Sequence, residues 1–182
     1  MSQLQVNSIV PVGGLPVGAS GGGIIQCVST FKNDTFSTTS TSLTDITGFN
    51  VTITPTSSAS KILLISEVGW GNDTNSAATF MNQLVRVVGG SPTNIANPDT
   101  STTSGGTAPH SNPNTNVYYS HNRWSYTFLD SPATTSAITY KWQVKAFSGA
   151  TTHINRRHYD STGNVGNDMQ GTSTITALEI SG

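Results

Sequence analysis

The sequence has little charge for its length. Its 182 residues include only eight basic and nine acidic side chains, 9% of the chain, and the formal net charge is −1. Average soluble domains carry about a quarter charged residues. Binding to the phosphate backbone of nucleic acids requires clustered Lys and Arg, so this composition argues against nucleic acid as a partner. Glu67 and Glu179 are the only glutamates, which leaves little material for the paired carboxylates of a glycosidase.

Cysteine and long apolar runs are also scarce. Cys27 is the only cysteine, which excludes an internal disulfide framework and a cysteine-based zinc cluster. No apolar run approaches the ~20 residues that a membrane-spanning helix requires, so we expect no membrane insertion. The opening residues 1–4 (MSQL) have neither a basic nor a hydrophobic region, and we expect no secretory signal there.

Small polar residues are abundant instead: the chain has 24 Ser, 28 Thr, 15 Asn and 18 Gly. These residues are mediocre or poor helix formers, whereas Thr fits a pleated strand surface. Hydrophobic residues make up 34% of the chain and include three Trp and six Phe, which is enough for a core and argues against disorder. The length suits one domain with a short appendage. The composition therefore indicates an uncharged, hydroxyl-rich β-protein.

Apolar and polar residues alternate with a period of two in several segments. The clearest example is residues 139–146, where Tyr140, Trp142 and Val144 share one face. Residues 61–70 begin apolar on both faces, as a central strand does. The predicted strands cover residues 24–28, 43–54, 61–70, 78–88, 117–130, 139–146, 151–159 and 172–180. Because no stretch has a convincing helical period, we predict an all-β fold, an antiparallel, jelly-roll-like β-sandwich of about eight strands.

Two segments fall outside this pattern. Residues 1–23 contain a short extended stretch with Leu4, Val6 and Ile9, followed by repeated Gly and Pro. We predict an extended N-terminal arm that needs a partner surface to become ordered, the alternative being a floppy tail, and a β-domain over residues 24–182. Residues 89–116 form a long Gly, Ser, Thr, Asn and Pro segment, predicted to be a functional or disordered loop.

Patterns that point to catalysis or metal binding are weak. Residues 18–22 (GASGG) match the G-x-S-x-G motif of hydrolases, but that motif needs a strand before the Ser and a helix after it. Neither is expected in the arm. His153 and His158 are five residues apart and would point to opposite faces of a strand, and His110 and His121 have no ligand-like spacing. We therefore expect no catalytic residue, no metal and no cofactor.

Two groups of residues are candidates for binding. Tyr118, Tyr119, His121 and Trp124 follow the long loop, among Asn and Ser residues. Aromatic rings with adaptable polar neighbours can stack on sugars, but an ordinary strand with Trp124 in the core and Tyr118 at its rim is the alternative. Arg156-Arg157 is a candidate contact for an acidic glycan or a neighbouring subunit, with a solvated surface pair as the alternative.

A series of loose segments carries a family resemblance. The segments are 35–42 (TFSTTSTS), 45–49 (DITGF), 53–55 (ITP), 60–63 (SKIL), 129–133 (LDSPA), 139–141 (TYK), 153–156 (HINR) and 173–180 (STITALEI). In this order they resemble a widespread group of tail-fibre-like, structural virion proteins of marine tailed bacteriophages. Residues 4–9 (LQVNSI) also resemble the N-terminal pieces of such proteins, which implies that Leu4, Val6 and Ile9 anchor the chain to the particle.

The resemblance implies a homotrimer located on the virion, assembled in the host cytoplasm and exposed on the particle. The expected function is that of a tail fibre or appendage component. Its arm would attach to tail or capsid proteins, and its β-domain would contact the host surface, including host glycan, through Tyr118, Tyr119, His121 and Trp124. A capsid decoration or cement protein with the same fold is the first alternative. A glycan-degrading tailspike-type enzyme is the second, and a lectin-like module outside this group is the third.

Overall fold

The computed structural model describes residues 23–73, 78–96, 110–112, 121–147, 149–157 and 170–182. Within these residues every regular element is a β-strand, which confirms the predicted all-β fold. In this part of the chain no helix has the length and apolarity that crossing a membrane requires. The predicted arm lies almost entirely outside the described residues, and the first strand begins at Ile24.

The described residues hold eleven strands. They are β1 (Ile24–Lys32), β2 (Phe36–Thr38), β3 (Thr44–Ile53), β4 (Lys61–Asn72), β5 (Ala78–Val88), β6 (Ser91–Ile95), β7 (His110–Asn112), β8 (Asn122–Asp130), β9 (Ile138–Lys145), β10 (Thr152–Ile154) and β11 (Ser173–Ile180).

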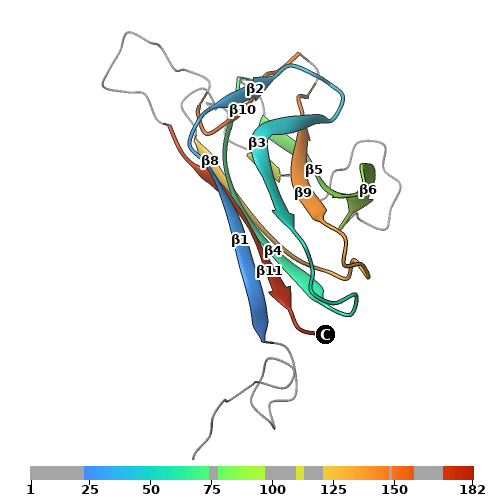
Figure 1. Ribbon diagram of the computed structural model, residues 1–182. Helices are drawn as coiled ribbons and strands as arrows, with labels where there is room; N and C mark the ends of the chain where they lie inside the picture. Colours follow the sequence, from blue (N-terminus) through green and yellow to red (C-terminus); the bar gives the residue numbers. More distant parts are fainter. Residues whose placement is uncertain (1–22, 74–77, 97–109, 113–120, 148, 158–169) are drawn as a thin grey trace, which may run out of the picture.

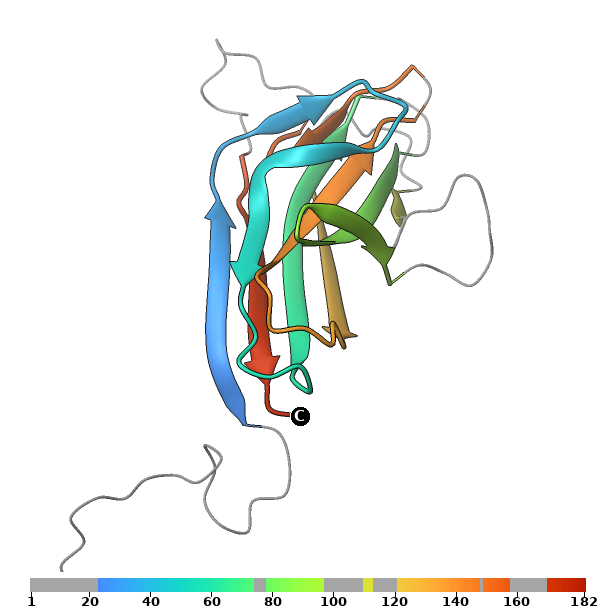
Figure 2. The same cartoon turned by 45° about the vertical axis from the view of Figure 1, so that its right-hand side comes forward.

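The strands form two antiparallel sheets with the connectivity of a jelly roll. Sheet A has the order β1-β11-β4, with β8 on the other side of β4, and β10 and β2 extend it beyond the start of β11. Sheet B has the order β3-β9-β5-β6, and the short β7 also pairs with β5. The long strands therefore have the orders 1-11-4-8 and 3-9-5-6, which is the double Greek key of a jelly roll. Figures 1 and 2 show the two layers.

Part of the predicted loop at 89–116 is regular structure. Gly89 and Gly90 have φ angles of 56° and 83°, the positive values that a tight hairpin turn requires, and they connect β5 to β6. Pro92 lies opposite Val87 on the edge of sheet B, where a residue without an N–H group is tolerated. The composition of β6 is that of a loop, but pairing with β5 makes it a strand. The prediction of an irregular segment from residue 89 was therefore wrong.

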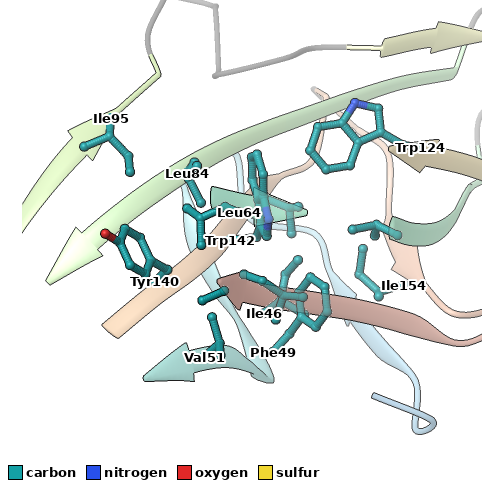
Figure 3. Close-up of a cluster of buried hydrophobic side chains, with 14 of the residues drawn as sticks. Ile46, Phe49, Val51, Leu64, Leu84, Ile95, Trp124, Tyr140, Trp142 and Ile154 are labelled. Atoms are coloured by element: carbon teal, nitrogen blue, oxygen red, sulfur yellow. The ribbon is translucent and has the colours of Figure 1, made fainter. Parts of the chain in front are cut away.

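Side chains from both sheets form one aromatic-centred core (Figure 3). Trp142 of β9 meets Trp124 of β8 edge to face, with ring centroids 4.6 Å apart, and Tyr126 stacks beside Trp124 at 5.7 Å. The Trp142 Nε1–H group donates a hydrogen bond to Ser66 Oγ of β4 at 2.9 Å, so a link between the sheets also satisfies the buried indole.

A buried carboxylate forms a second link between the sheets. Asp130, at the end of β8, accepts hydrogen bonds from Arg86 Nη1 at 2.9 and 3.0 Å and from the Tyr140 hydroxyl at 2.7 Å. Arg86 and Tyr140 are cross-strand neighbours in sheet B. Burial and the nearby carboxylate raise the pKa of Tyr140, so its hydroxyl stays protonated and donates. Removal of Arg86 would leave the Asp130 carboxylate buried without its charged partner.

Asn155 joins strand ends of sheet A. It is completely buried and has a φ of 61°, a conformation that Asn tolerates better than most residues. Both its backbone and its side chain are fully hydrogen-bonded. The bonds are Asn155 N to Gly69 O at 2.8 Å, Gly171 N to Asn155 O at 2.8 Å, Asn155 Nδ2 to Lys32 O at 3.0 Å and to Asp34 O at 2.9 Å, and Ser173 Oγ to Asn155 Oδ1 at 2.6 Å.

Glu179 is buried near the opposite end of sheet A. Its carboxylate accepts hydrogen bonds from Gln26 Nε2 at 2.6 Å and from the backbone N and the Oγ1 of Thr56, each at 2.7 Å. Burial by itself raises the pKa of Glu179, but the hydrogen bonds from Gln26 and Thr56 outweigh it and hold the pKa at about 2. The carboxylate therefore ties β1 and the β3–β4 connection to β11.

We predict that Asn155→Ala lowers the free energy of unfolding by about 3 kcal/mol. The change leaves several buried groups without hydrogen-bond partners, and Ala tolerates the positive φ of this position less well than Asn does. Denaturant unfolding measures the change. Asn155→Gly separates the two causes, since Gly relieves the φ but restores no hydrogen bond. The exposed Asn50→Ala is the control and should change stability by less than about 0.5 kcal/mol. An Asn155→Ala protein as stable as wild type would contradict this role.

We also predict an acid-labile contribution from Glu179. Because its folded pKa of about 2 lies below the ordinary value of 4.5, its charge stabilises the fold above pH 4.5, and this stabilisation is lost as the pH falls from 4.5 towards 2. In Glu179→Gln, this part of the pH dependence, about 2–3 kcal/mol, should be absent. Unfolding curves at pH 6, 4 and 3 test it. Glu67→Gln is the matched control, because Glu67 forms only an exposed 3.6 Å pair with Arg123.

Candidate interaction surface

Two of the four predicted contact residues, His121 and Trp124, lie within the described part of the chain. Trp124 is in β8, 7% exposed, and its ring packs against Tyr126 and Trp142 in the core. This is the core alternative of the sequence analysis, and the indole presents no open face for a ligand. Tyr118 and Tyr119, together with the predicted anchor residues Leu4, Val6 and Ile9, lie outside the described residues.

His121 precedes β8 and packs against backbone. A β-carbon added to Gly69 would lie 2.9 Å from the imidazole Cε1, and one added to Gly171 would lie 2.5 Å from it, so the ring occupies space that only Gly leaves free. Burial, and then the positive charge of Arg123, lower the pKa of His121 below its usual value. The imidazole is therefore neutral at neutral pH and mainly fills space between β4 and the start of β11.

Arg157 and His153, which were also considered in the sequence analysis, contact other parts of the fold. Arg157 is buried, and the Arg156 guanidinium donates to its carbonyl at 3.3 Å, so the predicted solvated pair is wrong for Arg157. His153 Nδ1 is hydrogen-bonded to Ser37 Oγ at 2.7 Å across the β10–β2 pair. In the part of the chain that the structure describes, no three His, Cys, Asp or Glu side chains are grouped so as to hold a metal ion.

The largest unexplained feature is the outer face of sheet A. The inner residues of β4, such as Ile62 and Leu64, are buried in the core. The alternate residues, Leu63 and Ile65, point outward, and Ile65 is 42% exposed. Antiparallel sheets in a sandwich normally have one apolar and one polar face, but the outer face of sheet A carries a cluster of apolar residues among its polar ones.

The register of sheet A brings these outward residues together. Cys27 of β1 lies opposite Leu178 of β11, which in turn lies opposite Leu63 of β4. On the other side of β4, Leu63 lies opposite Leu129 of β8, which is 46% exposed. Ile65 lies in the next row. We refer to Cys27, Leu63, Ile65, Leu129 and Leu178 as the outer patch; its residues come from the strands β1, β4, β8 and β11 that are labelled in Figure 1.

The outer face of sheet B is polar by comparison. Thr52 of β3 and Thr139 of β9 share a hydrogen bond of 2.8 Å between their hydroxyls. Asp45 accepts hydrogen bonds from Lys141 Nζ at 2.6 Å and from Gln143 Nε2 at 2.7 Å. Over β3 and β9 this face is polar, whereas over β5 its outward residues Met81, Gln83 and Val85 are buried. The exposed apolar residues on the outer face of sheet A make the outer patch a candidate interaction surface.

The sequence indicated the outward apolar residues but not their role. The beginning of segment 61–70 is apolar on both faces, which is equally compatible with a strand buried on both sides. A further signal is that Cys27, Leu129 and Leu178 each occupy an outward position in a strand that otherwise alternates between apolar and polar residues. It becomes visible only once the register of the four strands is known.

Comparison with known proteins finds no matching family model and no matching curated protein. Similar solved structures include one of the infectious bursal disease virus Gx strain, with 10% identity over 85% of this chain and a TM-score of 0.41. They also include the PRD1 vertex protein P5, with 13% identity over 88% of this chain and a TM-score of 0.38. The matches cover 39% of the first of those chains and 100% of the second, so this chain spans about two fifths of the first.

Proposed function

We propose that this protein is a structural component of a bacteriophage particle, most specifically of a tail fibre or another appendage. The observation that carries the proposal is the apolar outer patch on a protein in which only 9% of the residues are charged. An exposed apolar sheet face has to be covered for the protein to stay soluble, and an assembly provides that cover. The jelly-roll fold and the sequence resemblance to structural virion proteins support the same assignment.

The positions at which two chain segments join the domain favour an appendage. Ile24 lies in register with Ile180, and Ser181 N donates to Gly23 O at 3.0 Å, so the arm leaves the domain at the end where β11 finishes. Asn122, the first residue of β8, pairs with Trp70 at the far end of β4. The arm and the chain segment that leads into β8 are thus attached at opposite ends of sheet A. This arrangement suits a protein anchored at one end and in contact with a host at the other.

In this proposal residues 1–23 attach to other virion proteins through Leu4, Val6 and Ile9. Tyr118 and Tyr119, which precede β8, contact the host surface, and host glycan is the proposed ligand class. Trp124 has no part in that contact because it belongs to the core. The assembled form is the homotrimer that the resemblance implies, exposed on the virion after assembly in the host cytoplasm.

The proposal assigns binding and not catalysis to the chain. A glycosidase needs two carboxyl groups that flank one glycosidic bond. Glu67 is on the outer face of sheet A, whereas Glu179 points into the interior and is saturated with hydrogen bonds. These two residues cannot flank one bond. A capsid decoration or cement protein is the second candidate function, because an arm that leaves one end of the domain is equally suited to lying along capsid subunits.

Deletion of residues 2–22 tests the anchoring arm. The variant keeps Gly23, whose carbonyl is bonded to Ser181, and should therefore unfold at the temperature of the full chain. It should be absent from purified particles, whereas the full chain should give density on the tail in cryo-electron microscopy. Density on the icosahedral surface would favour the decoration protein, and absence of the full chain from particles would refute the proposal.

The host contact has its own test. Tyr119→Ala should weaken binding of the purified protein to host cells at least about fivefold, since loss of an aromatic contact at a binding site typically costs more than 1 kcal/mol. Thr52→Ala, on the polar outer face of sheet B, is the control and should bind like wild type. Unchanged binding by a folded Tyr119→Ala protein would show that the contact lies elsewhere.

A further inference from the structure

We infer that the outer patch is the surface through which this chain packs against further copies of itself. The inference rests on the proposed function, which requires a covered surface, and it names both the surface and the partner. The patch lies on long, regular strands paired with one another, so its geometry is fixed before any partner binds.

The extent of the surface fits a stable contact. Four strands at a spacing of about 4.8 Å, with about eight residues each at about 3.3 Å per residue, make a face of roughly 500 Å². A partner that covers this whole face, with the outer patch at its apolar centre, buries on the order of 1,000 Å² counted over both partners, the size at which specific protein interfaces begin. The corrugation of the side chains adds to this area.

The distribution of charge favours a copy of the same chain over a charged partner. The row from Cys27 to Leu129 contains no charged residue, and the row of Ile65 contains only Thr and Ser besides it. The nearest charges of β4, Lys61 and Glu67, lie at the two ends of the face. Interfaces between identical subunits are more apolar than transient ones and are depleted in charge at the centre. With a net charge of −1, copies also repel one another little.

The neighbouring edge of sheet A strengthens the inference. β1 has β11 on one side and, among the described residues, no paired strand on the other. Between Ile24 and Phe31 this edge strand contains neither a charge nor a proline, and those two side chains are 63% and 61% exposed. Proteins usually protect such edges from pairing with another chain. An unprotected edge beside an apolar face is therefore a second surface that needs cover.

The two surfaces are different, which bears on the symmetry of the assembly. If the outer patch of one copy packs against the exposed side chains of β1, such as Ile24, in the next copy, the contact is heterologous. Heterologous contacts close into rings when the rotation between subunits allows it. The inferred contact is thus compatible with the trimer of the proposed function.

The experiment compares the mass of the full chain with that of two surface variants by light scattering at about 50 μM. Ile65→Lys combined with Leu129→Lys places two charges on the outer patch at exposed positions, where they leave the core intact. Thr52→Lys combined with Thr54→Lys places the same charges on exposed residues at the end of β3 and directly after it, and is the matched control. Thermal unfolding verifies that both variants are folded.

Wild type and the Thr52/Thr54 variant should be oligomers, whereas the Ile65/Leu129 variant should be a folded monomer. A monomeric wild type, or an Ile65/Leu129 variant with the mass of wild type, would overturn the inference. If the Ile65/Leu129 variant fails to fold, the single Leu129→Lys change replaces it and the same two outcomes apply.

Cys27 provides an independent readout, because it is the only thiol in the chain and lies in the outer patch. In assembled wild type it should react with a maleimide at least about tenfold more slowly than in the Ile65/Leu129 variant. Equal rates would overturn the placement of the contact. A self-associating protein that is absent from particles would refute the proposed function alone, and a monomer found on the tail would refute this inference alone.

Discussion

The hydrogen bonds of Asn155 hold together the end of sheet A on which the rest of the fold depends. One buried amide, in a left-handed conformation, satisfies backbone groups from the end of β1, from β4 and from the segment leading into β11. A charged side chain at this place would need a buried counterion, whereas an amide is neutral and has both donors and an acceptor. Lys32, whose carbonyl Asn155 binds, is itself buried at this junction, and Asp34 lies 2.7 Å from its Nζ.

The same constraint explains how the interior is organised elsewhere. Asp130 is buried, but Arg86 and Tyr140 from the opposite sheet complete its hydrogen bonds. Glu179 is buried, and donors from Gln26 and Thr56 keep it ionised. Asp130 and Glu179 therefore each also connect segments that are distant in sequence. Together with the aromatic cluster around Trp142, these links fix which face of every strand points inward.

Once the inner faces are fixed, the alternation of the strands determines the outer ones. Leu63 and Ile65 have to point outward because Ile62 and Leu64 point inward. The result is a cluster of apolar side chains, the outer patch, on the outer face of sheet A. The proposed role in a particle, and self-association through the outer patch, both rest on this cluster.

The sequence alone determined the class of fold and much of the pattern. The alternation of Tyr140, Trp142 and Val144 with polar residues defines a strand by local chemistry, and the scarcity of charge is a property of composition. It could not decide which apolar face of residues 61–65 is core, because a period of two gives two equivalent faces when both are apolar. Nor could it reveal β6, whose stability comes from pairing with β5, or assign Trp124 to the core and not to a ligand. Only the tertiary structure decided these points, because each depends on contacts between residues far apart in the chain.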